Sequence, residues 1–240
     1  MRHLIPTLLL PLGVCAAMAQ CPCAQSGRDA APRACARQTK GSDKMVQVNN
    51  ADYYRNGQFD SQKAAEAYFA LMRQFGLQVP EAFIKDKGFF WAIDFKRGNF
   101  AACGMGGVIY VNEKAESYFV HDIFLLPGQA IAEHRHVATD KPAKMESWLV
   151  RCGSVYGFSE VGEPNLDQFP EVKAMLSKEH LDHLKSLHVE KWTADGRAHK
   201  LPRIETWHFM MGGPEGAIVT EAATYHDGNG LRFANPAVAF

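Results

Sequence analysis

The sequence lacks an excess of charge of either sign. Its 240 residues carry 26 lysines and arginines against 26 aspartates and glutamates, so the formal net charge is zero. Nucleic acids and anionic membrane surfaces attract proteins through clustered positive charge, and this balance supports neither partner. An internal repeat is absent too, which leaves one domain, or one domain with an extended terminus, as the expected organisation.

The sequence also lacks an apolar run that could span a bilayer. The run over residues 4–14 is shorter than the ~20 residues that a membrane helix needs. A short positively charged start precedes it, and Ala17-Met18-Ala19, the small-residue pattern of a signal-peptide cleavage site, follows it. We therefore expect residues 1–19 to be a secretory signal and the protein to be exported to a bacterial periplasm. A buried N-terminal strand is the alternative, disfavoured by the polar residues 20–40.

Cysteine is scarce, with six in the whole chain and one of them inside the expected signal. Cys21 and Cys23 lie too close together to bond easily with each other, but either could pair with Cys35 in an oxidising compartment. Their spacing does not fit a zinc site. Cys103 and Cys152 are expected to behave as small, buried apolar residues.

The remaining chain divides into a leader and a folded domain. Residues 20–50 are of low hydrophobicity and are predicted to be a flexible leader. Residues 51–240 are predicted to form the domain. Its first element is a helix capped by Asp60 or Ser61, with an apolar stripe at helical spacing that continues to Phe75. A further helical turn is expected shortly afterwards, over residues 81–87.

Strand patterns dominate from Phe89 onward. Runs of aromatic and β-branched residues are interrupted at glycines or charged pairs, which predicts strands with breaks at Gly98, residues 104–107 and residues 113–114. Another strand is expected over residues 154–161.

A helical insertion is expected to interrupt the strands. Residues 171–192 have a helical apolar pattern and are predicted to form one helix beside the strands, with His180 and His183 facing solvent. The last two strands are expected over residues 201–211 and 217–225, with a hairpin loop between them.

The clearest chemical signal is a pair of histidines followed by a glutamate. His134 and His136 are separated by one residue, so on a strand both side chains project from the same face. Glu146 follows after a polar turn, on the next expected strand. Two neutral imidazoles and a carboxylate are ligands for a divalent ion such as Mn, Fe, Ni or Zn. The alternative, a chance pair of histidines on a polar strand end, does not account for the glycines that flank the segment.

This glycine-flanked pattern resembles the first metal motif of the cupins, a superfamily of small β-barrels. The spacer before Glu146 is longer than usual. The resemblance implies a mainly β fold, a single cupin-type β-barrel (jelly roll) with an N-terminal helix and a helical insertion. It also implies a fourth ligand from a late histidine that follows a proline-containing turn. His208 occupies that place, although Gly212 stands where cupins usually have an asparagine.

Several short stretches in the same order resemble the D-lyxose isomerases, a cupin family of aldose–ketose sugar isomerases. They cover roughly residues 88–236 and include residues 91–95, 126–129, 133–136, 144–146, 206–209 and 213–221.

The resemblance implies roles for individual residues, with His134, His136, Glu146 and His208 as the metal ligands. Glu221 matches the acid/base glutamate, with a solvent-facing strand glutamate as the alternative. His121 stands where the family has a lysine that assists proton transfer, and period two predicts that it faces inward. Lys144 could hydrogen-bond a sugar hydroxyl or Glu221. A raised pKa of Glu221 in a desolvated barrel would suit its role.

The expected function is a metal-dependent isomerase that acts on D-lyxose or a related sugar such as D-mannose through an enediol route. One divalent ion is expected, with Mn2+ preferred and Zn2+, Fe2+ or Ni2+ as alternatives. The expected partner is a small sugar, without nucleic acid or a membrane span, and a homodimer is an open option. Two other functions stay open: an iron-dependent cupin dioxygenase, and a non-catalytic periplasmic sugar-binding cupin in which His121 marks loss of activity.

Overall fold

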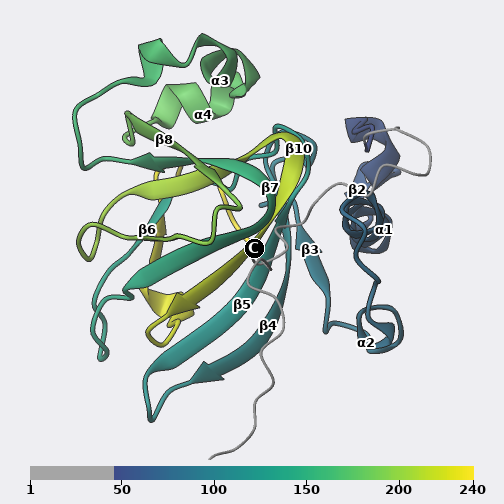
Figure 1. The fold of residues 1–240 in the computed structure, drawn as a ribbon, viewed down its shortest axis with the longest axis horizontal. Helices are drawn as coiled ribbons and strands as arrows, with labels where there is room; N and C mark the ends of the chain where they lie inside the picture. The colour runs from purple at the N-terminus through teal and green to yellow at the C-terminus, as the bar shows by residue number, and fades with distance from the viewer. Residues whose placement is uncertain (1–45) are drawn as a thin grey trace, which may run out of the picture. The chain divides into compact units, whose positions relative to one another are not determined.

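The computed structural model describes residues 46–240, and nine strands of this part form one antiparallel sheet (Figure 1). The predicted signal, most of the predicted leader, and Cys21, Cys23 and Cys35 lie outside the described residues. Within residues 46–240, none of the helices is long and apolar enough to cross a membrane.

Strand β10 is the centre of the sheet. It pairs with β7 along its length on one side and with β5 and β6 on the other. The sheet curls around an interior, which confirms the mainly β, cupin-type fold (Figure 1). Its strands are β3 (Trp91–Ile93), β4 (Met105–Glu113), β5 (Tyr118–Leu125), β6 (His134–His136), β7 (Glu146–Ser159), β8 (His188–Thr193), β9 (Ala198–Lys200), β10 (His208–Ala223) and β11 (Leu231–Phe233). The short strands β1 (Tyr54–Arg55) and β2 (Gln58–Phe59) pair separately with each other.

The two faces of the sheet bury different sets of apolar side chains. Along β5, Ile123 and Leu125 belong to the cluster inside the curl, whereas Phe124 and the following Leu126 belong to the cluster outside it. This alternation is the period of two that a strand imposes. His121 is in phase with Ile123 and therefore points inward, as the sequence predicts.

Helix α1 (Ser61–Gln74) covers the outer face of the sheet. Its predicted start is confirmed, because the Asp60 side chain accepts a hydrogen bond from the backbone N–H of Lys63 at 3.0 Å. Tyr68 and Leu71 are fully buried on the face that meets the sheet. The predicted helical turn after α1 is also present, as α2 (Glu81–Lys85), which follows the 3-10 turn η1 (Asn50–Tyr53) and α1 in chain order.

Strand β4 runs through a glycine segment that the sequence predicts as a break. A Cβ on Gly106 would lie 2.5 Å from the Tyr68 ring, and one on Gly107 would lie 2.5 Å from the Trp91 ring. These glycines therefore let two aromatic rings pack directly on the strand. The prediction is wrong there because close backbone approach, rather than a turn, explains the glycines.

The predicted helix over residues 171–192 is wrong. The segment forms two short helices, α3 (Pro170–Met175) and α4 (Lys178–His183), followed by β8 on the edge of β7. Ser177 separates the helices, because its side chain caps α4 by accepting from the backbone N–H of His180. His180 is 9% exposed, so its predicted solvent-facing position is wrong too, whereas His183 is exposed. The short turn η2 (Leu166–Gln168) precedes α3.

The predicted hairpin loop between the last two strands is not a loop. Strand β10 continues through it, with an irregular register against β7 between Gly212 and Ala217. A Cβ on Gly213 would lie 2.2 Å from Ser154 Oγ on β7, so the glycine keeps the two strands together. The tail, predicted to be irregular, contributes the turn η3 (Gly228–Gly230) and strand β11, which pairs with β6.

Candidate active site

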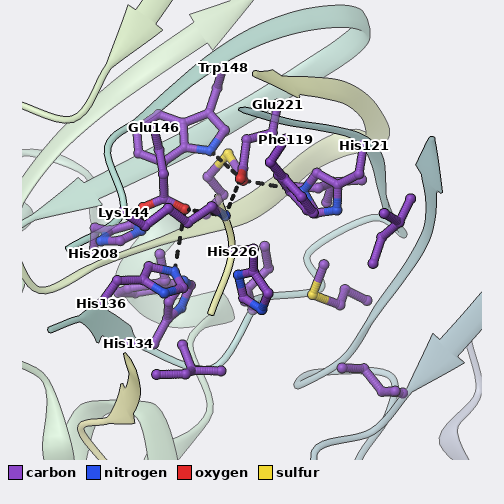
Figure 2. Close-up of a pocket in the computed structure, with 18 of the residues that line it drawn as sticks. Phe119, His121, His134, His136, Lys144, Glu146, Trp148, His208, Glu221 and His226 are labelled. Atoms are coloured by element: carbon purple, nitrogen blue, oxygen red, sulfur yellow. Dashed lines mark hydrogen bonds and ion pairs between the residues drawn. The ribbon is translucent and has the colours of Figure 1, made fainter. Parts of the chain in front are cut away.

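Three strands bring the four predicted metal ligands together. His134 and His136 lie on β6, Glu146 is the first residue of β7 and His208 is the first residue of β10. One possible ligand atom from each residue lies within 4.8 Å of all the others (Figure 2). His134 is half-buried and the other three are buried.

Hydrogen bonds fix the orientation of two of these imidazoles. His134 Nδ1 lies 2.9 Å from the carbonyl oxygen of Ala132, and His208 Nδ1 lies 2.8 Å from that of Thr206. A carbonyl oxygen only accepts, so Nδ1 carries the proton in each ring. Nε2 is then the unprotonated nitrogen, and it faces the cluster. In metal sites, a hydrogen bond from the other ring nitrogen commonly orients a histidine in this way.

The cluster holds acceptors that need a positive charge between them. His208 Nε2 and Glu146 Oε2 lie 3.0 Å apart, and neither has a hydrogen-bond partner among residues 46–240. His136 Nε2 lies 3.4 Å from Glu146 Oε1. Buried acceptors without donors are costly, and a shared cation removes that cost. Three imidazole nitrogens and one carboxylate oxygen therefore suit a divalent ion. The longest distance between two of these atoms is roughly 1 Å greater than the distance between ligand atoms around one bound ion.

Burial and charge move the pKa values of the ligands in different directions. Burial lowers the pKa of His134 well below its usual value, and neighbouring His208 and His136 add to the effect. Burial acts in the same direction on His208, but the charge of Glu146 outweighs it and raises the pKa. Burial would raise the pKa of Glu146, yet Lys144 and the two imidazoles hold it well below its usual value. Glu146 is therefore ionised, as a ligand must be.

Lys144 joins the ligand cluster to a second buried cluster. Its Nζ donates to Glu146 Oε1 at 3.0 Å and also to Glu221 Oε1, while the ammonium lies 4.4 Å from the centroid of the Phe119 ring. Lys144 is 5% exposed. One buried cation thus neutralises two carboxylates that would otherwise repel each other.

Glu221 has a donor on each oxygen. Its Oε2 accepts from Trp148 Nε1 at 3.0 Å and lies 3.2 Å from His121 Nε2, while Oε1 accepts from Lys144 (Figure 2). His121 on β5 and Trp148 on β7 are its cross-strand neighbours on either side of β10. Burial would raise the pKa of Glu221, but Lys144 outweighs burial and, with His121, holds it well below the usual value. The raised pKa expected from the sequence is wrong, because Lys144 supplies a charge inside the barrel.

All seven predicted site residues line one cavity of about 360 Å³. Its volume lies within the ~300–1,000 Å³ typical of small-molecule sites. The rest of its wall is mainly apolar and includes Trp91, Phe95, Phe119, Trp148, Phe209 and Phe233. The cavity therefore combines a few polar groups with broad aromatic surfaces.

The sequence prediction missed His226, which also lines this cavity. Its ring lies 5.3 Å from that of His136 and 5.5 Å from that of Phe119, between ring centroids. Burial, followed by the charges of Lys144 and His136, lowers the pKa of His226 to about 4. Its position in an irregular tail after β10 gives no strand or helix period that could reveal it.

Comparison with known proteins points to sugar isomerases. No protein-family model matches the chain. A D-lyxose/D-mannose isomerase of Thermosediminibacter oceani is 29% identical over 147 residues, which are 60% of this chain and 76% of the relative. A D-lyxose ketol-isomerase of Cohnella laeviribosi is 35% identical over 130 residues, 53% of this chain and 66% of the relative. A D-lyxose ketol-isomerase of a Thermofilum species is 30% identical over 129 residues, 53% of this chain and 67% of the relative.

The fold has counterparts among solved structures. The crystal structure of an Acinetobacter L-ribose isomerase in complex with L-ribose superposes with a TM-score of 0.57 at 17% identity. The match covers 81% of this chain and 95% of that one. The curled sheet described above is therefore shared well beyond the segment that sequence comparison aligns.

Proposed function

The chain belongs to the D-lyxose ketol-isomerase family of sugar isomerases, and from this premise we propose that it interconverts D-lyxose, or a related sugar such as D-mannose, with the corresponding ketose in a metal-dependent reaction. The observation that carries the proposal is the meeting of two buried clusters in one cavity. Unsatisfied acceptors at one end suit a cation, and an ionised carboxylate at the other suits proton transfer.

The ligand cluster defines where the reacting end of the sugar would lie. His134, His136, Glu146 and His208 would hold one divalent ion, with Mn2+ as our preferred candidate. When bound, such an ion supplies Lewis-acid stabilisation for the negative charge that develops on the sugar oxygens. The Nδ1–carbonyl hydrogen bonds of His134 and His208 keep these rings oriented before the sugar arrives.

Glu221 is the proposed base that moves the proton between C2 and C1 in an enediol route. Lys144 keeps it ionised, so it is ready to accept a proton at neutral pH. Oε1 of Glu221 accepts from Lys144 and Oε2 accepts from Trp148, and a carboxylate oxygen has a second lone pair that can take a proton. His121, 3.2 Å from Glu221, is the proposed carrier of the proton between O1 and O2.

The aromatic wall of the cavity suits the less polar faces of a sugar. Trp148 has two roles in the site, because its ring lines the cavity while its Nε1 donates a hydrogen bond to Glu221. Glu221 is 4% exposed, and its donors Lys144 and Trp148 are in place before the sugar arrives. A pre-arranged site lowers the cost of charge development during the reaction.

A reaction in D2O tests the enediol route. Metal-loaded protein is incubated with D-lyxose, and the ketose is analysed by NMR. The proposal predicts a ketose with deuterium at C1, because the proton held by Glu221 exchanges with solvent. Ketose without deuterium would contradict transfer through a Glu221 carboxyl whose proton exchanges with solvent. Oxygen consumption with iron would instead favour the dioxygenase, and tight sugar binding without turnover would favour the binding protein.

We also propose that the protein is exported to a periplasm after removal of residues 1–19, and a homodimer is the proposed assembly. N-terminal sequencing of the protein secreted by its host should begin at Gln20, whereas a retained Met1 in a cytoplasmic fraction would contradict export. Light scattering of the purified protein tests the homodimer.

A further inference from the structure

His226 lines the cavity, and its imidazole makes no hydrogen bond with any of residues 46–240. Its Nδ1 is buried, whereas Nε2 is not, so Nε2 is the nitrogen that a ligand can reach. In Figure 2 the ring lies across from Glu221, between His136 and His121. A polar nitrogen in a mainly apolar wall favours a ligand that hydrogen-bonds it. The metal cluster and the Glu221 cluster do not explain the role of this nitrogen.

The backbone around His226 is held in place residue by residue. The His226 N–H donates to Asn112 Oδ1 at 3.0 Å, and Asn112 Nδ2 donates to the His226 carbonyl oxygen at 3.0 Å. Thr224 before it exchanges two hydrogen bonds with Met145, through its N–H and its hydroxyl, each 2.9 Å long. Asp227 after it accepts from Thr139 Oγ1 at 2.7 Å.

These anchors come from separate segments of the chain, so the loop is fixed although it has no regular secondary structure. Such fixing costs conformational entropy during folding and is typical of positions whose side chain must be pre-organised. The Asn112 side chain makes both hydrogen bonds to the backbone of His226, so it fixes the position of the backbone that carries the imidazole. Asn112 itself does not line the cavity.

We propose that His226 binds a non-reacting hydroxyl of the sugar through Nε2 and that Asn112 positions the ring. The inference rests on the proposed function for the identity of the ligand. The metal ligands lie on one side of the cavity, and Glu221 with His121 lies on another, which leaves C1 and C2 between them. His226 then faces the remaining hydroxyls, so it contributes to the choice of sugar rather than to proton transfer.

Variants of His226 test the contact atom. His226→Phe keeps a ring and removes both nitrogens, whereas His226→Gln keeps a hydrogen-bonding group close to the position of Nε2. We expect His226→Phe to raise KM, and the dissociation constant of D-lyxose, roughly 3- to 10-fold with kcat nearly unchanged, because the contact exists in both ground and transition states. His226→Gln should retain most of the affinity. His183→Phe, at an exposed histidine of α4, is the matched control.

A cycle with Asn112 separates positioning from general stability. Asn112→Ala should raise KM by itself but add little in the His226→Phe background, because the hydroxyl contact is already lost. Additive effects would contradict the positioning role. Metal content is measured for every variant, and it should stay equal to that of the wild type.

The outcomes also separate this inference from the proposed function. If the wild type isomerises D-lyxose and His226→Phe leaves KM and sugar binding unchanged, the inference is wrong and the proposed function stands. If the wild type binds D-lyxose without turnover and His226→Phe weakens the binding, the isomerase proposal is wrong and the inference stands. Equal loss of affinity in His226→Phe and His226→Gln would contradict the assignment to Nε2.

Discussion

The two ends of β10 carry buried polar clusters that differ in how fully they satisfy themselves. At the His208 end, His208 Nε2 and Glu146 Oε2 face each other without a donor. At the Glu221 end, one carboxylate oxygen accepts from Lys144 and the other from Trp148, and His121 Nε2 lies 3.2 Å from the second. The first cluster leaves acceptors that a cation would satisfy, whereas the Glu221 carboxylate is already held by protein donors.

This difference assigns separate tasks to the two ends of one strand. An incomplete set of acceptors favours binding of an ion from solution, and a complete set fixes a carboxylate in one orientation and keeps it charged. Lys144 connects the two, because it donates to both carboxylates. A substitution of Lys144 therefore changes both clusters, whereas substitutions of Glu221, His208 and His121 change one of them.

Glu221→Gln should have the largest effect. The amide keeps the size of the side chain but cannot take a proton from C2, so kcat for D-lyxose should fall by about 10²- to 10⁴-fold. Metal content, measured by elemental analysis, should stay unchanged because the ligand cluster is intact. Full activity of this variant would refute the acid/base role of Glu221.

Lys144→Met should destabilise the fold. It leaves Glu146 and Glu221 buried without their shared cation, and breaking a buried ion pair in this way costs about 3–5 kcal/mol of unfolding free energy. Urea unfolding at pH 7 measures the loss. Exposed Lys178→Met, which removes an ion pair with Asp182 on the surface of α4, is the control and should change stability by less than about 1 kcal/mol. Similar stability of the two variants would contradict the buried network.

His208→Ala should weaken metal binding without removing the charged Lys144–Glu221 pair. The loss should exceed the ~10- to 100-fold typical of an outer-shell partner, since a ligand itself is removed. Competition with a chelator of known affinity measures it. In addition, Mn2+ should raise the melting temperature of the wild type but not of the variant. An unchanged metal affinity would exclude His208 as a ligand.

The stability of the protein should fall in acid partly because of Glu221. Its pKa in the folded protein lies below the ordinary value of 4.5, so the stabilisation is present above about pH 4.5 and is lost as the pH falls. The unfolding free energy of the wild type should therefore decrease by up to about 1.4 kcal/mol per pH unit more steeply than that of Glu221→Gln below this point. Parallel pH profiles of the two proteins would contradict the depressed pKa.

His121→Lys should have the smallest effect. A lysine at this position restores the residue that the family resemblance implies, and its ammonium can take the place of the imidazole beside Glu221. Activity on D-lyxose should be kept or raised, as measured by initial rates. A large loss would show that the chain depends on the imidazole, and His121→Phe, which has no proton to move, is the comparison that isolates that dependence.

Local sequence signals predicted the parts of the site that one strand or one cap controls. His134 and His136 share a face because a strand alternates, and Asp60 caps α1 because its side chain accepts a backbone N–H. Family resemblance added His208 and Glu221, which lie far along the chain. Both side chains reach the residues of other strands in the cavity because β10 pairs with β5 on one side and with β7 on the other.

Long-range contacts account for what the sequence could not predict. The depressed pKa of Glu221 depends on Lys144, 77 positions away, and the placement of His226 depends on Asn112, 114 positions away. Gly213 was read as a hairpin signal because its true role, close approach to Ser154, exists only once β7 and β10 are paired. The prediction of one helix over residues 171–192 is wrong for the same reason. The end of that segment is strand β8, which pairs with β7.

Removal and return of the metal tests the central claim most directly. Purified protein is stripped with a chelator, dialysed and assayed for ketose formation from D-lyxose before and after addition of one equivalent of Mn2+. We predict that activity disappears with the metal and returns at a stoichiometry of about one ion per chain, with Glu221→Gln binding the ion equally well but staying inactive. Ketose formation that persists in metal-free protein, or its absence in fully reloaded protein, would contradict the account.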